Sequence, residues 1–552
     1  MKFLRGFWKL FERPSPLTQA KPGIETAEPI KVSPIGTGKE SALSSTRVPE
    51  SPKDKKELTD TTSTSVSSSL EVKKQYTSDP DPEAKHYKPI REPVMATPTY
   101  PTGPLIRPKR EKVYLQIGID FGTSSTKIVY SQLSKAGAHA ISFNHKLPHY
   151  PDYCLPSIAA IDKSGRLLLG TEAARALANE RWDKGFQRFK VIVAGNCDEL
   201  FEDAVTCKMF FDYRDSCNGL ESNFTAERLT AIYLAYAMNL ARNYLKNLSE
   251  YQNSDLDLTF NICMPIDHIE NNLVRTTFND LFAWAEAIES IWQRKGGSFD
   301  VLNASHECEG ATHDTTCRTF AVPEAVAEVA SYLSSLRRRE GLHAVIDFGA
   351  GTTDVSIFRL RVTAGEMVSD WYAARNIPRG TANIERMIAH HLPVNNNIGI
   401  CTYCDIQQKI HYLSNDGNFS DSIKNELYDL WKSKDYSGTW GAAHKHLNLQ
   451  IPWEKVEVFT CGGGASLPYI EDIFSVPWWD NLHVKYPVTG LPTPYNYDPG
   501  PSSAPFSRMA VAYGLSIPKP QLDRYILPND VGDQTPTPLS VRELDHEVMY
   551  AR

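Results

Sequence analysis

Two segments of the chain combine an aspartate, a glycine turn and hydroxyl residues in the same order: QIGIDFGTSSTKIVY at 116–130 and VIDFGAGTTDVSIF at 345–358. Glycine lets the backbone approach a ligand closely, and successive N–H groups in such a turn can bind an anion. Both turns are therefore expected to bind phosphate. The residues expected to do so are Gly122, Thr123, Ser124, Gly349, Ala350, Gly351 and Thr352.

An aspartate stands at the mouth of each turn, Asp120 in the first and Asp347 in the second. A carboxylate repels phosphate unless a cation lies between them. Mg²⁺ suits this position, because it keeps several waters and bridges carboxylates to substrate phosphates. The sequence therefore predicts Mg²⁺ at these two aspartates, with both turns clamping one polyphosphate. A single turn of this kind is typical of a plain tight hairpin, and the repetition favours the functional interpretation.

A third element, FTCGGGASLP at 459–468, has the pattern of a strand that ends in glycines and opens a helix. Gly462, Gly463 and Gly464 lack side chains, so a flat base or a ribose could lie against the backbone there. The alternative is a plain loop of glycines.

The order of these motifs resembles that of the actin-like ATPase superfamily. VPEAVAEVA lies between the two turns at 322–330, and AVAYGLS follows the glycine run at 510–516. The chain is most similar to the nucleotide-binding domain of seventy-kilodalton heat-shock (DnaK-like) chaperones, over about residues 113–517. The resemblance implies an α/β, two-lobed actin-like ATPase fold of duplicated ribonuclease-H-like domains, with ATP and Mg²⁺ in the cleft.

The resemblance also implies roles for the aspartates, the turns and the glycine run. Asp120 would orient metal-bound water, Asp347 would be the second aspartate on the metal side, and Thr352 would lie at the phosphates. Gly462 to Gly464 would contact ribose and adenine. Lys127 matches a lysine that reaches phosphate in actins and some sugar kinases. The alternative for Lys127 is a solvent-facing lysine on a strand.

The expected catalytic residues are Lys190, Glu324, Asp347 and Thr352. The chaperones carry a lysine near the γ-phosphate, for which this sequence offers Lys190 or else Arg188. Glu324 is expected to position or polarise the attacking water, as a general base does. Because the order Pro-Glu reverses that of the chaperones, Glu328 one turn later is the alternative. Asp354 is expected to brace the second turn.

The chain has ordinary globular composition and alternates predicted strands with helices, which indicates an α/β protein. The predicted divisions are an amphipathic helix at 1–14, a disordered linker at 15–112, lobe I at 113–342, lobe II at 343–517 and a C-terminal tail at 518–552. The linker is rich in Pro, Ser, Thr and Lys.

The first segment, MKFLRGFWKLFERP, places apolar residues at helical spacing among basic ones. It is expected to lie on a membrane surface or in a partner's groove; the alternatives are a turn folded back on the body, or disorder.

The net charge of −7 does not suggest nucleic acid as a partner. The ten scattered cysteines indicate reduced thiols and a cytoplasmic protein. Cys401 and Cys404 form one CxxC, half of a zinc site. His306, Cys308, His313 and Cys317, in another loop, could contribute the other ligands. Free thiols are the alternative.

These observations predict an ATP-hydrolysing module whose cleft closure is read by a protein partner, such as a co-chaperone or complex subunit. Only about 35 residues follow the predicted body, which is too short for a client-binding domain. Alternatives are a polymerising actin-like filament, a small-molecule kinase, and a nucleotide-sensing scaffold without turnover.

Overall fold

The computed structural model of the chain describes residues 110–147, 150–179, 182–187, 190, 193, 225–296, 300–381, 383–384, 417–447, 453–478, 482–522 and 524–531. All of them belong to one unit of the chain, Thr102–Arg552. The predictions for the helix at 1–14, for the linker as far as residue 109, for Arg188, for Cys401 with Cys404, and for the tail beyond residue 531 lie outside the described residues. None of the described helices is both long enough and apolar enough to cross a membrane.

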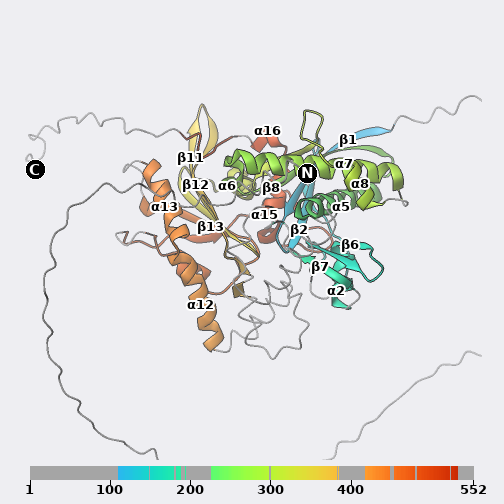
Figure 1. Cartoon of the computed structure of the whole chain (residues 1–552). Coiled ribbons are helices and arrows are strands. Elements are labelled where there is room, and N and C mark those ends of the chain that lie inside the picture. Colours follow the sequence, from blue (N-terminus) through green and yellow to red (C-terminus); the bar gives the residue numbers. More distant parts are fainter. Residues whose placement is uncertain are drawn as a thin grey trace, which may run out of the picture. The chain divides into compact units, whose positions relative to one another are not determined.

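The described residues form a mixed α/β fold with three sheets, so the α/β prediction is confirmed (Figure 1). The first sheet has the strand order β15-β3-β2-β1-β8-β9, with β4 beside β2. Strands β1, β2 and β3 are antiparallel neighbours, whereas β8 and β9 run parallel to β1. Their bounds are β1 Glu111–Phe121, β2 Ser125–Gln132, β3 Ala138–Ala140, β4 Leu155–Pro156, β8 Ser254–Met264, β9 Thr319–Pro323 and β15 Tyr497–Asp498.

The second sheet, in the order β14-β13-β10-β11-β12-β16, repeats this arrangement. Strands β10, β11 and β12 are antiparallel neighbours, and β13 and β14 run parallel to β10. The chain therefore builds the same five-strand pattern twice. The bounds are β10 Gly341–Phe348, β11 Thr353–Thr363, β12 Glu366–Ile377, β13 Glu457–Cys461, β14 Val488–Gly490 and β16 Tyr525–Ile526.

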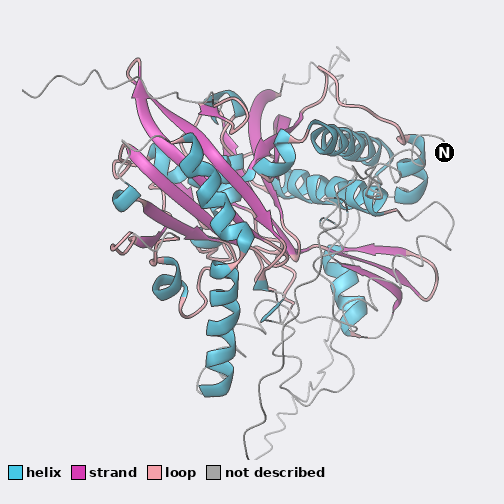
Figure 2. Ribbon diagram, turned by 60° about the vertical axis from the view of Figure 1, so that its left-hand side comes forward, coloured by secondary structure: helices cyan, strands magenta, loops and turns pink. Residues whose placement is uncertain are grey.

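Helices cover the sheets, which explains why the central strands β1 and β10 are almost continuously buried. Helices α5 (Ala226–Asn247) and α7 (Asn272–Lys295) pack in one hydrophobic core with the first sheet. Thr225 caps α5 by accepting a hydrogen bond from Arg228 N. Helices α12 (Gly417–Lys432) and α13 (Lys434–His446) contribute to a separate core with the second sheet (Figure 2).

Two helices join the sheets at the centre of the unit, α9 (Glu324–Ser334) and α15 (Phe506–Leu515). They pack on each other, and α15 also contacts β1, β2, β8 and β13. Gly514 of α15 touches the backbone of Ala327 in α9, and Gly118 of β1 touches the backbone of α15. Segment 497–517, which the sequence assigns to lobe II, therefore packs against the first sheet through β15 and α15.

The remaining described elements form a third sheet and several short helices. This sheet has the order β6-β5-β7 and packs against α2. The bounds of these elements are β5 Ile158–Asp162, β6 Leu167–Leu169, α2 Gly170–Ala178, β7 Trp182–Gln187, α6 Ile266–Glu270, α8 Val301–Glu307, η2 Trp453–Lys455, α14 Ile470–Phe474 and α16 Lys519–Leu522.

Candidate functional site

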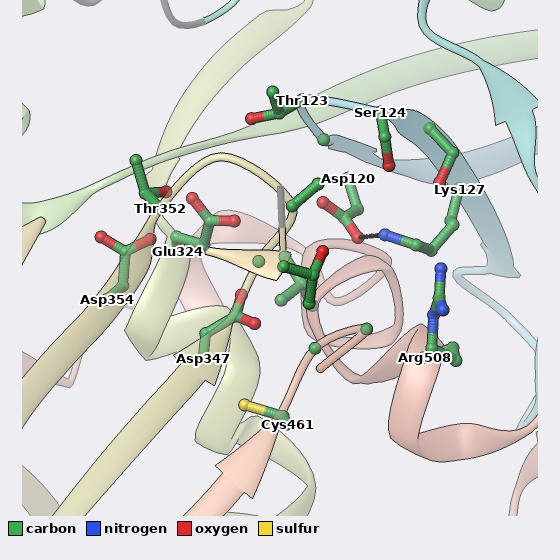
Figure 3. A pocket seen from close by; sticks show the side chains of 18 of the residues that line it. Asp120, Thr123, Ser124, Lys127, Glu324, Asp347, Thr352, Asp354, Cys461 and Arg508 are labelled. Atoms are coloured by element: carbon green, nitrogen blue, oxygen red, sulfur yellow. Dashed lines mark hydrogen bonds and ion pairs between the residues drawn. The ribbon is translucent and has the colours of Figure 1, made fainter. Parts of the chain in front are cut away.

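A cavity lies where the turns of the two hairpins, β1–β2 and β10–β11, face each other (Figure 3). Nearly all the residues predicted from the sequence line it, whereas Gly351 and Gly464 do not. Its lining residues are Asp120, Gly122, Thr123, Ser124, Ser125, Lys127, Lys190, Glu324, Asp347, Gly349, Ala350, Thr352, Asp354, Thr381, Cys461, Gly462, Gly463, Ser507, Arg508, Ala510 and Val511.

The two turns have matching geometry. Gly122 lies against the carbonyl of Ser125, and Gly349 lies against the carbonyl of Thr352, so a side chain at either glycine would collide with the backbone three residues on. Each turn also accepts a backbone hydrogen bond from a residue outside the hairpin. Ser157 N donates to Ser124 O at 3.0 Å, and Thr381 N donates to Gly349 O at 3.0 Å.

Backbone donors remain for a ligand in both turns. Within the described part of the chain, no hydrogen bond uses the N–H groups of Thr123, Ser124, Ala350 or Gly351. The Gly122 N–H differs, because it donates to Asp120 O at 3.1 Å. Free N–H groups in a glycine turn are suited to an anion.

Asp120 is already satisfied by protein groups. Its Oδ2 pairs with Lys127 Nζ at 2.7 Å, and the Cys263 thiol donates to its Oδ1 at 3.8 Å. Burial opposes the charge on Lys127, but Asp120 holds the pKa of this lysine above its ordinary value. The Lys127 side chain is only 12% exposed, so the alternative of a solvent-facing lysine is wrong.

Asp347, the counterpart of Asp120, is not satisfied in this way. Its carboxylate is buried, and Oδ1 has no hydrogen-bond partner among the described residues. Burial, with the nearby charges of Glu324 and Asp120, raises the pKa of Asp347 to about 7. Gly462, with φ of +80°, sits against Asp347 Oδ1 and Phe348 O, so this glycine shapes the pocket around the aspartate.

The strand register explains the difference between the two aspartates. Asp120 lies opposite Lys127 in the first hairpin, whereas Asp347 lies opposite Asp354 in the second. The second hairpin therefore carries a carboxylate where the first carries an ammonium group. Burial, Glu324 and Asp347 together raise the pKa of Asp354 well above its ordinary value, and Asn376 Nδ2 donates to Asp354 Oδ1 at 2.7 Å.

Glu324 and Lys190 form an ion pair on the cavity wall, with Lys190 Nζ at 3.5 Å from Glu324 Oε2. Glu324 is the first residue of α9, where the helix dipole stabilises a carboxylate. Burial opposes the charge on Lys190, yet Glu324 and neighbouring acidic groups hold its pKa above the ordinary value. The pair brings together a candidate base and a candidate cation.

Glu328, one turn later in α9, lies behind the cavity wall. It is buried and accepts a hydrogen bond from the Cys461 thiol. Burial and the charge of Asp347 raise the pKa of Glu328 well above its ordinary range. Of the two candidate glutamates, only Glu324 lines the cavity.

Seven lining residues had no role predicted from the sequence: Ser125, Thr381, Cys461, Ser507, Arg508, Ala510 and Val511. Ser507 and Arg508 lie in the first turn of α15, far along the chain from the turns. The AVAYGLS motif, which begins at Ala510, pointed to this helix but not to these two residues. Thr381 reaches the cavity because the segment after β12 folds back on the second turn.

The zinc site stays a prediction, because Cys401 and Cys404 lie outside the described residues, and Cys308 and Cys317 are free thiols. His313 Nε2 contacts Thr319 O at 2.9 Å, and His306 lies 3.8 Å from Glu309. The groups of potential ligands that come together in the described part of the chain are Asp120, Cys263 and Glu324, and separately Glu328, Asp347 and Cys461.

The donor set of the cavity fits Mg²⁺ at Asp347. Magnesium takes oxygen ligands from one or two carboxylates, and substrate phosphates and waters complete its shell. Asp347 offers a buried carboxylate oxygen with no other described partner. The Cys461 and Cys263 thiols, whose pKa values burial raises well above the ordinary range, remain protonated and are unsuited to it.

No protein-family model matches this chain, and no curated protein matches it. Function is therefore inferred from the geometry of the cavity and from the repeated sheet pattern.

Proposed function

We propose that this protein is an ATP-binding and ATP-hydrolysing module of the actin-like type, similar to the nucleotide-binding domain of heat-shock chaperones. Two ribonuclease-H-like domains, one around each large sheet, would form its lobes. Asp120 and Lys127 on one hairpin and Asp347 on the other would hold Mg²⁺-ATP between them.

The observation that carries this proposal is the pairing of two equivalent hairpins around one cavity. Each hairpin starts the same five-strand pattern, and each presents an aspartate and free N–H groups at its turn. A single hairpin of this kind would be compatible with a structural turn. Two of them facing one another form the two halves of a site for a polyphosphate.

The residues of the cavity then have distinct roles. Glu324 accepts a proton from the attacking water, and Lys190 places a positive charge beside it. The N–H groups of both turns bind phosphate oxygens, and the hydroxyl of Thr352 adds a donor. Mg²⁺, when bound at Asp347, supplies charge neutralisation for the transferred phosphoryl group.

The position of the cavity supports a cycle in which the lobes open and close. Residues of both hairpins line it, so a nucleotide bound there would contact both lobes. Closure would then be read by a protein partner, and residues 1–14 would tether the module to that partner or to a membrane surface in the cytoplasm.

Calorimetric titration with Mg²⁺-ATP and a phosphate-release assay test the proposal. Binding with slow phosphate release is expected. The absence of binding would overturn the proposal, and binding without release would favour a nucleotide-sensing scaffold. Light scattering that rises with ATP would favour a filament.

Replacement of Glu324 by glutamine is expected to slow phosphate release about 100-fold, because it removes the base and retains the shape of the side chain. Affinity for Mg²⁺-ATP should change by no more than a few-fold. Glu328→Gln is the matched control, since this residue lies one turn later in the same helix and outside the cavity. A larger loss in Glu328→Gln than in Glu324→Gln would contradict the assignment.

A further inference from the structure

Asp347 and Cys461 occupy paired positions on two neighbouring strands. Asp347 is the last residue but one of β10, Cys461 is the last residue of β13, and the parallel register places them directly opposite each other. Paired residues in a sheet direct their side chains to the same face. Both residues line the cavity, where their side chains lie next to each other (Figure 3).

Glu328 brings a third donor to this pair. It lies in the second turn of α9 and accepts a hydrogen bond from the Cys461 thiol. Glu328 and Cys461 are each 1% exposed. The ligand atoms of Glu328, Asp347 and Cys461, one from each residue, all lie within 4.8 Å of one another. Zinc lies about 2.3 Å from a sulfur ligand and about 2.1 Å from a carboxylate oxygen, so small side-chain movements bring the three atoms to one ion.

The Asp347 carboxylate favours a cation at this place. Asp347 is 8% exposed, and no described residue gives its Oδ1 a hydrogen bond. Glu328 adds a second buried carboxyl group to the same cluster, where like charges repel each other. A bound divalent cation offsets both of these unfavourable terms.

The other cluster of potential ligands in the described part of the chain is Asp120 with Cys263 and Glu324. Its two carboxylates already hold ammonium groups. Lys127 Nζ lies 2.7 Å from Asp120 Oδ2, and Lys190 Nζ lies 3.5 Å from Glu324 Oε2. A metal in this cluster would have to displace a lysine from each carboxylate, so it is the less suitable of the two.

The donor set at Asp347 selects the kind of metal. Magnesium and calcium take oxygen ligands, whereas zinc also takes the sulfur of cysteine and accepts carboxylates beside it. A metal that binds a cysteine removes the thiol proton. The proton that Cys461 now donates to Glu328 therefore passes to solvent as the Zn–S bond forms.

We propose that Glu328, Asp347 and Cys461 form a site for Zn²⁺, which inhibits the protein by withdrawing Asp347 from Mg²⁺. Zn²⁺ enters from the cavity, which Asp347 and Cys461 line, and a water takes the fourth position. The zinc site itself stands on the geometry of the three residues. Its inhibitory effect rests on the proposed function, in which Asp347 holds Mg²⁺.

The first test measures metal binding by the full chain without nucleotide, using Co²⁺ absorption and calorimetric titration with Zn²⁺. Wild type should show the near-ultraviolet band of a thiolate bound to Co²⁺, and Cys461→Ser should bind one Co²⁺ fewer. Zn²⁺ affinity at this site should fall about 100-fold in Cys461→Ser and about 10- to 100-fold in Glu328→Gln. The matched control is Cys263→Ser, which removes the thiol of the other cluster and should bind Zn²⁺ as wild type does. The double variant Cys401→Ser/Cys404→Ser should keep the site, because it lacks only the CxxC.

The second test measures inhibition. Zn²⁺ should slow phosphate release from Mg²⁺-ATP by wild type, with each rate compared with the rate of the same protein without zinc. Glu328→Gln should need at least about 10 times more Zn²⁺ for half inhibition, because it loses one zinc ligand. Equal inhibition of wild type and Glu328→Gln would show that zinc acts elsewhere and would overturn the inhibitory role.

The outcomes distinguish this inference from the proposed function. If wild type binds Mg²⁺-ATP, and Cys461→Ser binds Zn²⁺ as tightly as wild type, the zinc site is wrong and the ATPase proposal stands. If wild type binds Zn²⁺ through Cys461 but does not bind Mg²⁺-ATP, the zinc site stands and the nucleotide proposal is wrong.

The controls locate the site. Loss of the cobalt band in Cys263→Ser or in Cys401→Ser/Cys404→Ser, with an undiminished band in Cys461→Ser, would place the metal elsewhere and overturn the site. Should Cys461→Ser fail to fold, Glu328→Gln decides, because glutamine keeps the shape of the side chain. Undiminished Zn²⁺ affinity in Glu328→Gln would then overturn the site.

Discussion

Asp347→Asn is expected to reduce phosphate release from Mg²⁺-ATP about 100-fold or more, and to make the ligand-free protein more stable at pH 8. The first effect follows because asparagine lacks the negative charge that holds the metal. The second follows because Asp347 is buried, with no hydrogen-bond partner for Oδ1 among the described residues. Removing a buried, unsatisfied charge stabilises the folded state.

The sign of the pH dependence follows from the pKa of about 7 that Asp347 has in the folded protein, well above the ordinary aspartate value of 3.8. The folded protein binds the proton more tightly than the unfolded chain does. The free energy of unfolding therefore falls as pH rises from 3.8 through 7. Above pH 7 the ionised Asp347 lowers the free energy of unfolding by about 2 to 4 kcal/mol. The melting temperature of Asp347→Asn should exceed that of wild type by several degrees at pH 8 and converge with it near pH 4.

Asp370→Asn provides the matched control, because Asp370 is also a buried aspartate in the second sheet. It accepts a hydrogen bond from Arg361 Nη2 at 3.0 Å, so its charge is satisfied. Its replacement removes the ion pair with Arg361, which keeps only its hydrogen bond to Thr363 among these contacts, and should destabilise the protein. If Asp347→Asn lowered the melting temperature at pH 8 as Asp370→Asn does, Asp347 would be a structural residue and the metal assignment would fail.

The hairpins could be predicted from the sequence because their signals are local. Asp-Phe-Gly followed by hydroxyl residues specifies a turn, and the apolar runs on either side specify strands. The pairing of Asp120 with Lys127 follows from the same local rule, since residues that flank a hairpin turn symmetrically face each other. The same spacing brings Asp354 opposite Asp347. Asp354 therefore lines the cavity, in addition to the bracing of the turn that the sequence predicted for it.

Arg508 could not be predicted in this way. Its place in the cavity depends on where α15 crosses the first sheet, and that crossing is fixed by contacts between residues hundreds of positions apart. The choice between Glu324 and Glu328 was open for a related reason. Both lie on one face of α9, and only the boundary between β9 and α9 decides which of them reaches the cavity. The third sheet was missed because strands such as β6 are too short to show an alternating hydrophobic pattern.

The crossing of α9 and α15 gives the second large effect: Gly514→Ala is expected to destabilise the protein by about 2 to 3 kcal/mol, the cost of overpacking a tight contact. A Cβ atom at Gly514 would collide with Ala327 O and would lie 2.7 Å from Ala327 Cα. Backbone atoms cannot move aside as a flexible side chain can, so the two helices must separate. Glu324 begins α9 and Arg508 lies in the first turn of α15, and hence separation should also slow phosphate release.

Gly441→Ala is the control for Gly514→Ala, because Gly441 also lies within a helix, α13, and an added Cβ would meet nothing within 4 Å. Alanine there should stabilise the protein by about 0.4 to 1 kcal/mol, since it removes only the flexibility of the unfolded chain. Urea unfolding, followed by tryptophan fluorescence, measures both variants, and opposite shifts of the midpoint are expected. Equal midpoints for Gly514→Ala and wild type would show that α9 and α15 are not in backbone contact. A lowered midpoint with undiminished phosphate release would instead show that the positions of Glu324 and Arg508 do not depend on the crossing.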